Sequence, residues 1–254
     1  MAFRSEETAG CVSRAGARAG LEPRIAPAFL LVLIALLPAM ISAAEYNVRH
    51  DHIRGGCAGT LTIDEGGVSY HESDGHKREH PHDWTWNYLD IQQLELSAKR
   101  FRILTYIDSR WKLGEDRQYS FTAQGGSDFS SAYALLKDRL DQRFIAELAD
   151  AGVRPMWEIP VKHLGGAGGS QGLLIVGDTR IVYQTGRKGD ARTWRYGDID
   201  NISTSGPFNL TLTSFERAKS HYGNRKDFNF QLKEPLDERK YDELWRRLNL
   251  RSNQ

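Results

Sequence analysis

The stretch Trp86-Asn87-Tyr88-Leu89-Asp90-Ile91 returns later in the chain as Trp194-Arg195-Tyr196-Gly197-Asp198-Ile199. Each copy lies among segments in which polar and apolar residues alternate, the pattern of β-strands. Apolar landmarks around the copies also line up, at offsets between 107 and 113. The pairs are Leu61 with Leu173, Tyr70 with Tyr183, Phe101 with Phe208, Phe121 with Phe230, and Leu135 with Leu244. The sequence therefore predicts an internal duplication of two related modules of roughly 100 residues each.

The N-terminus has the pattern of an export signal. Four arginines within residues 1–24 precede an apolar run over 25–37, and small residues, Ala43 and Ala44, then lead to Glu45. This pattern predicts a signal peptide over 1–44, cleaved after Ala44, and a periplasmic or secreted protein. An uncleaved N-terminal anchor is the alternative, because residues 25–44 are long enough to span a bilayer.

Composition narrows the function classes. Removal of residues 1–44 takes four arginines and three glutamates from 34 basic and 33 acidic side chains, which leaves 30 of each. A neutral surface of mixed charge argues against a nucleic-acid binder, which needs a basic footprint. Cys11 leaves with the signal, so Cys57 remains without a partner for an intramolecular disulfide. Stability is then expected from packing and strand pairing.

Two modules follow the signal, over 45–150 and 151–254. In the first repeat (residues 45–150), periodicity predicts strands and then one amphipathic helix over 129–148, capped by Ser127 or Asp128. The predicted strands are 59–63, 68–70, 84–89, 101–106 and 118–122. In the second repeat (residues 151–254), strands are predicted over 173–176, 181–183, 192–196, 208–213 and 228–232. A closing helix is expected with Pro235 just inside its start and with Tyr241, Leu244, Trp245 and Leu248 on its apolar face.

The repeated motif is explained by the fold. The Trp and Tyr of each copy stand two residues apart, so they can fill one core layer from one face of a strand. Asp90 and Asp198 fall where the strand ends, and there a short carboxylate can accept backbone N–H bonds and set a turn.

The order of these elements carries a family resemblance. An aromatic strand ending in Tyr-x-Asp-Ile, preceded by a Gly-led hairpin and followed by paired strands and a C-terminal helix with a Trp, resembles the pleckstrin-homology-like (PH-like) superfamily, in particular GRAM and bacterial PH-like modules. The resemblance covers residues 55–148 and 157–250. It implies a mainly β (α+β) fold in which each module is a bent antiparallel sheet or half-open barrel, capped by its C-terminal helix.

The phosphoinositide ligand of many PH domains is not expected to bind this chain. Phosphoinositide-binding PH domains carry basic residues around the first hairpin loop, whereas the corresponding loops here are Asp64-Glu65-Gly66-Gly67 and Gly177-Asp178-Thr179-Arg180. An acidic loop repels a phosphorylated headgroup. The glycine-rich loop 165–170 also lacks the Lys-Ser or Lys-Thr pair and the following helix of a phosphate cradle, so we interpret it as a hairpin loop.

Histidines supply the strongest chemical pattern. Six of the eight lie between residues 50 and 82. His50-Asp51-His52 and His80-Pro81-His82-Asp83 contain imidazole and carboxylate donors suited to zinc or copper. The hypothesis that follows is a metal site formed by His76, His80 and His82, and its alternative is a solvated polar loop over 71–83.

The sequence gives less support for enzyme chemistry than for metal binding. No hydrolase elbow, metalloprotease helix or dinucleotide fingerprint is present, so no enzyme activity, catalytic residue or cofactor is predicted, and an unrecognised hydrolase is the third alternative. Cys57 is interpreted as a small packed hydrophobe.

Basic residues gather at two loops of the second repeat, as Arg187, Lys188 and Arg192, and as Arg217, Lys219, Arg225 and Lys226. Together with Tyr222 they could form a weakly basic edge. The sequence as a whole predicts an exported, non-enzymatic interaction module, with an unidentified protein or an anionic membrane surface as its partner. A metal-binding protein is the competing class.

Overall fold

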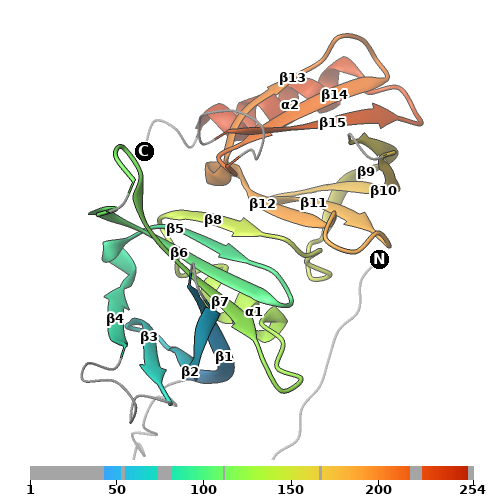
Figure 1. The fold of residues 1–254 in the computed structure, drawn as a ribbon. Helices are drawn as coiled ribbons and strands as arrows, with labels where there is room; N and C mark the ends of the chain where they lie inside the picture. Colours follow the sequence, from blue (N-terminus) through green and yellow to red (C-terminus); the bar gives the residue numbers. More distant parts are fainter. Residues whose placement is uncertain are drawn as a thin grey trace, which may run out of the picture. The chain divides into compact units, whose positions relative to one another are not determined.

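The computed structural model describes residues 43–52, 55–73, 82–110, 112–165, 168–217 and 225–250. Within them the fold is mainly β, with fifteen strands in a single sheet and two α-helices (Figure 1). None of the helices in these ranges is both long and apolar enough to cross a bilayer. Of the predicted signal peptide over 1–44, the structure describes only Ala43 and Ala44. Strand β1 begins at Ala44.

The first repeat contributes eight strands and the short helix α1. The strands are β1 (Ala44–His52), β2 (Gly55–Ile63), β3 (Gly67–Glu72), β4 (Asp83–Asn87), β5 (Ile91–Leu96), β6 (Arg100–Asp108), β7 (Asp116–Ala123) and β8 (Arg143–Ala146). Helix α1 spans Ser130–Leu136, and a 3-10 turn, Tyr88–Asp90, follows β4.

The second repeat contributes seven strands and helix α2 (Glu238–Leu250). The strands are β9 (Pro155–Leu164), β10 (Ser170–Gly177), β11 (Arg180–Thr185), β12 (Arg192–Arg195), β13 (Ile199–Ser203), β14 (Asn209–Ser214) and β15 (Lys226–Leu232). A second 3-10 turn, Tyr196–Asp198, follows β12. Helix α2 packs on β13 (Figure 1).

The two repeats have the same strand order. The sheet runs β13-β14-β15-β9-β10-β11-β12 through the second repeat and β5-β6-β7-β1-β2-β3-β4 through the first, with β8 between them. Each series has its own apolar cluster, one built around Leu61, Tyr70 and Phe121 and the other around Leu174, Tyr183 and Phe230. The repeat seen in the sequence is therefore a repeat of topology as well.

Strand register corrects two of the paired landmarks. Leu61 faces Tyr70 across β2 and β3, and the residue that faces Tyr183 in the second repeat is Leu174. Leu173, the partner expected from the sequence, points the other way and is only half-buried. Likewise Leu210 faces Phe230, while Phe208 is 48 % exposed. The alternation of polar and apolar residues shows which side chains share a face of a strand. Only the pairing register with the neighbouring strands shows which of the two faces is buried.

The predicted helix over 129–148 is wrong in its second half. Helix α1 ends at Leu136, and residues 143–146 form β8, which pairs in parallel with β5. The backbone N–H of Phe144 donates to Asp198 Oδ1 over 2.9 Å, and Arg195 donates to the carbonyl oxygen of Leu140. These contacts from the second repeat hold the segment extended, which overrides its helical spacing.

The turn and cap predictions fare better. Asp90 and Asp198 each accept the backbone N–H of the residue three positions earlier, over 3.2 and 3.3 Å, as expected for turn-setting carboxylates. Asp128 accepts the Ser130 N–H over 2.7 Å at the start of α1. In the closing helix, Leu244 and Leu248 are buried as predicted, but Trp245 is 49 % exposed and Pro235 precedes the helix rather than lying within it.

Candidate metal centre

Strands β1 and β2 place three metal-binding side chains on one face of a hairpin. Tyr46, Val48 and His50 alternate inward along β1, and His52 continues the same side at the strand end. Cys57 lies on β2 directly opposite His50 in the antiparallel ladder. Opposite residues bring their side chains within contact distance, so this register alone joins an imidazole to the thiol.

A fourth donor comes from the start of β4. His82 immediately precedes that strand, and its backbone N–H donates to Glu72 Oε2 over 2.8 Å. The Glu72 N–H in turn donates to the His82 carbonyl oxygen over 3.2 Å. The His82 ring stacks on Trp84, with the ring centres 4.8 Å apart. These contacts fix both the backbone and the ring of His82 beside the hairpin.

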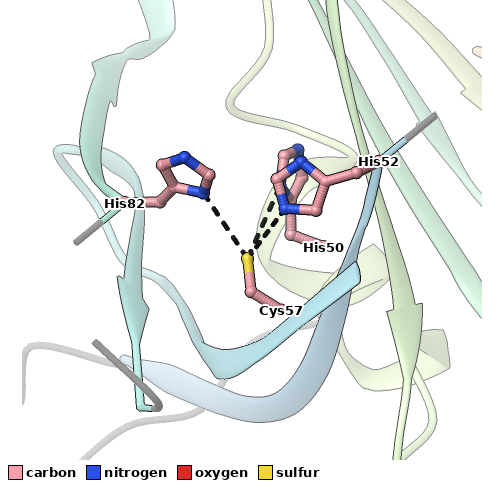
Figure 2. Close-up of side chains that lie close together, drawn as sticks. All are labelled: His50, His52, Cys57 and His82. Carbon is pink, nitrogen blue, oxygen red and sulfur yellow. Dashed lines mark hydrogen bonds between the residues drawn. The ribbon is translucent and has the colours of Figure 1, made fainter. Parts of the chain in front are cut away.

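The four side chains converge on one point (Figure 2). Cys57 Sγ lies 3.1 Å from His52 Nε2, 3.5 Å from His82 Nδ1 and 3.8 Å from His50 Nδ1. His50 Nδ1 lies 3.3 Å from His52 Nε2. All four donor atoms lie within 4.8 Å of one another. Within the described part of the chain, this is the one group of at least three such residues with that proximity.

Four of the six separations among these donor atoms are close to the ligand–ligand distances of a tetrahedral zinc site, and all six are within 4.8 Å. Bond lengths of about 2.3 Å for Zn–S and about 2.05 Å for Zn–N, at tetrahedral angles, put sulfur about 3.5 Å from each nitrogen and two nitrogens about 3.3 Å apart. The three sulfur–nitrogen distances, 3.1, 3.5 and 3.8 Å, scatter around the first value, and the nitrogen–nitrogen distance of 3.3 Å matches the second.

Burial keeps His50 in its metal-binding form. The residue is 7 % exposed, and burial, followed by the charges that His52 and His82 would carry, lowers the pKa of His50 from 6.5 to about 4. Asp51 and Glu72 act in the opposite direction but more weakly. His50 is therefore neutral at pH 7, and a neutral imidazole is the form that binds metal.

Polar and aromatic groups surround the cluster. Tyr70 donates its hydroxyl hydrogen to the Cys57 carbonyl oxygen over 3.1 Å, and its oxygen lies 3.2 Å from Cys57 Sγ. The Glu72 carboxylate is buried, and its Oε2 lies 3.6 Å from His82 Nδ1. Trp84 meets the His50 ring edge-on at 4.8 Å. His50 and Cys57 are thus buried, His52 and His82 are half-buried, and the Glu72 carboxylate lies beside them.

One of the three residues of the predicted metal site lies in this cluster. His82 belongs to the cluster, whereas His76 and His80 lie outside the described residues. His50 and His52 were recognised as donors but were not joined to His82. His71 points elsewhere and pairs with Asp83 over 2.6 Å.

The interpretation of Cys57 as a packed hydrophobe is confirmed in its burial but is incomplete. Cys57 belongs to the buried apolar cluster of the first repeat, and its sulfur also lies beside three imidazoles and a phenol. The pattern His-x-His-x4-Cys over residues 50–57 was the sequence feature that could have revealed the site. It required β1 to be recognised as a strand.

The predicted basic edge of the second repeat is largely neutralised where the structure describes it. Arg192 is 4 % exposed, and its guanidinium binds both Glu216 and Glu147. Other pairs are Arg187 with Asp190, Arg217 with Glu115, Arg225 with Asp200, and Lys226 with Glu216. Lys219 and Tyr222 lie outside the described residues. These ion pairs leave less free positive charge for an anionic bilayer than the sequence suggests.

Comparisons with known proteins add little to this geometry. No family model matches the chain, and no curated protein matches it. Solved structures similar to it include the C-terminal domain of an unknown protein from Leishmania infantum, 14 % identical, with a TM-score of 0.29 over 39 % of this chain and 86 % of that one. A myosin VII MyTH4-FERM MF2 domain from Dictyostelium discoideum is 20 % identical, with a TM-score of 0.27 over 39 % of this chain and 18 % of that one. The Spt16D Pob3N heterodimer is 11 % identical, with a TM-score of 0.27 over 74 % of this chain and 97 % of that one.

Proposed function

We propose that this protein binds one divalent metal ion of the zinc type through His50, His52, Cys57 and His82. The observation that carries the proposal is the agreement of four of the six donor separations with the edges of a tetrahedral site with one sulfur and three nitrogen ligands, all six separations being within 4.8 Å. Calcium and magnesium do not suit this donor set, because they take oxygen ligands. A thiolate with imidazoles suits zinc, and copper is the main competitor.

The charge balance also favours a divalent ion. Binding deprotonates the thiol, so a Zn²⁺ ion with one thiolate and three neutral imidazoles keeps one positive charge. The Glu72 carboxylate, buried 3.6 Å from His82 Nδ1, supplies the compensating negative charge. A buried site that is neutral overall avoids the cost of an unpaired buried charge.

The role that fits this donor set is structural or metal-storing rather than catalytic. Four protein ligands complete a tetrahedron, whereas catalytic zinc keeps one position for water or substrate. The ligands also come from three separate places, the end of β1, the start of β2 and the residue before β4. A bound ion would therefore tie these strand ends together and stabilise one end of the first repeat.

The context proposed for this metal centre is an exported protein built from two PH-like modules. The signal-peptide pattern over 1–44 supports the location, and the shared seven-strand order of the repeats supports the tandem of modules. The closing helix α2 of the second repeat fits the PH-like pattern, and in the first repeat α1 is followed by the additional strand β8.

Zinc titration against a chromophoric chelator tests the proposal. The purified protein is expected to bind one equivalent of zinc. Replacing a residue that merely supports a ligand typically costs about 10- to 100-fold in affinity, so His50→Ala, His52→Ala and Cys57→Ser are each expected to cost at least about 100-fold. His71→Ala is the matched control, since that exposed histidine lies on β3, outside the cluster.

The same titration separates the centre from the histidine-rich loop. The tetrahedron is complete without His76 and His80, so the double variant His76→Ala/His80→Ala is expected to keep wild-type affinity. Absence of zinc binding by the wild type, or equal binding by Cys57→Ser, would show that the cluster is not a metal centre.

A further inference from the structure

The second repeat has an equivalent group of side chains, His163, Ser170 and Tyr183, at the same place in its sheet. His163 faces Ser170 across β9 and β10, just as His50 faces Cys57 across β1 and β2. In both repeats the second residue of the pair comes seven positions after the first. His163 and Ser170 each lie 113 positions after their counterparts, His50 and Cys57. Tyr183 likewise lies 113 positions after Tyr70. Three residues of the metal centre therefore have counterparts fixed by ladder register.

Hydrogen bonds show that the two groups of side chains are equivalent. Tyr183 donates to the Ser170 carbonyl oxygen over 2.9 Å, and its hydroxyl lies 2.8 Å from Ser170 Oγ. Tyr70 makes the same pair of contacts to Cys57, over 3.1 and 3.2 Å. The serine hydroxyl of the second repeat thus occupies the place of the thiol.

The aromatic surroundings agree as well. The His50 ring lies 5.8 Å from Tyr70 and 5.2 Å from Phe121. The His163 ring lies 5.8 Å from Tyr183 and 5.4 Å from Phe230. Each imidazole is therefore enclosed by a tyrosine and a phenylalanine from equivalent strands.

What differs is the set of donors around the imidazole. Gly165 stands where His52 stands, two residues after the shared histidine, and a Cβ added there meets no atom within 4 Å. Arg192 faces Tyr183 as Trp84 faces Tyr70, so Asp190, two residues earlier, takes the place of His82. Among the residues that the structure describes, His163 Nδ1 is buried without a hydrogen-bond partner, whereas His50 Nδ1 faces a thiol and an imidazole.

We infer that the second repeat holds a latent metal site in which His163 keeps its ligand position while Gly165, Ser170 and Asp190 replace the other three ligands. The protein therefore binds one zinc-type ion per chain, not two, and the group around His163 becomes a metal site when three donors are introduced at those positions. The inference rests on the proposed function of the first repeat for the choice of ion.

Metal stoichiometry of the full chain tests this inference. The triple variant Gly165→His/Ser170→Cys/Asp190→His is expected to bind a second equivalent of Co²⁺, with a new thiolate-to-cobalt absorption in the near ultraviolet. The matched control replaces Gly165→His by Gly186→His, since a Cβ at Gly186 also meets no atom within 4 Å. That control adds the same ligand types with one of them misplaced, so its second ion is expected to bind at least about 100-fold more weakly.

Combination with Cys57→Ser distinguishes the two claims. In that background the triple variant is expected to bind one ion tightly, whereas its parent binds metal at least about 100-fold more weakly than the wild type. If the wild type binds one ion and the folded triple variant still binds one, the inference is overturned and the proposed function stands. If the wild type binds none and the triple variant binds one, the first centre fails while the inference holds.

A smaller change covers the case in which the triple variant does not fold. Circular dichroism and urea unfolding establish the fold of each variant. The double variant Ser170→Cys/Asp190→His keeps the native Gly165 backbone and supplies three protein ligands, which leaves a fourth position for water. It is expected to bind a second Co²⁺ weakly, and a folded double variant without a second site would overturn the inference.

Discussion

Acid should weaken the metal-free protein through His50. The pKa of His50 is about 4 in the folded chain and 6.5 when unperturbed. Between these values the unfolded chain binds the proton more readily, so the free energy of unfolding falls as the pH falls. With these two values, linkage gives a loss of about 1.8 kcal/mol between pH 7 and pH 5 as an upper bound. Solvent screening of the neighbouring His52 and His82 charges brings the expected loss to about 1 to 1.8 kcal/mol.

Urea unfolding in the presence of a chelator measures this loss. The comparison is the wild type against His50→Asn, each at pH 7 and pH 5, because other groups titrate in both proteins and cancel in the difference. His50→Asn is expected to be less stable at pH 7 but to lose about 1 to 1.8 kcal/mol less on acidification. His71→Asn, at an exposed position, should keep the wild-type dependence. If His50→Asn loses as much stability as the wild type, burial does not hold His50 neutral and the electrostatic reasoning fails.

The remaining predictions concern packing and metal linkage. Arg192→Met leaves the buried Glu216 with Lys226 but without its guanidinium, so we expect a loss of about 3 kcal/mol in urea unfolding, and Arg192→Met/Glu216→Leu should recover part of it. A single-variant loss as small as that of a surface ion pair would contradict the burial of this pair. Asp198→Ala removes the acceptor of the Phe144 N–H and should cost about 1 to 3 kcal/mol, with faster amide exchange in β8 as its signature. Zinc at 100 times its dissociation constant adds about 2.7 kcal/mol, which should raise the Tm by about 5 to 11 °C in the wild type and leave Cys57→Ser unchanged. An equal rise in the Tm of both proteins would show that zinc binds at a site that does not include Cys57.

The sequence could predict the repeat and most strands because these depend on local periodicity. Alternation identified the hairpin of β2 and β3, the aromatic strand β4 and their counterparts in the second repeat. It could not identify β8, because the extended form of residues 143–146 depends on Asp198 and Arg195, more than 50 residues away. Three- and four-residue spacing describes a helix only where no distant partner competes for the backbone.

The types of residue in the candidate metal centre could be predicted from the sequence, but not which individual residues form it. Histidine crowding led to His82, and the same count pointed to His50 and His52. Cys57 joins them through an antiparallel ladder, and a one-residue change of register would turn its sulfur to the other face of the sheet. That register depends on β1, whose alternation of Tyr46, Val48 and His50 was not used as evidence for a strand.

X-ray absorption at the zinc edge tests the central claim most directly. The zinc-loaded wild-type protein should show one sulfur at about 2.3 Å and three nitrogens at about 2.0 to 2.1 Å. The sulfur shell should vanish in Cys57→Ser and persist in His71→Ala. A zinc environment of oxygen and nitrogen alone in the wild type would contradict a centre built from His50, His52, Cys57 and His82.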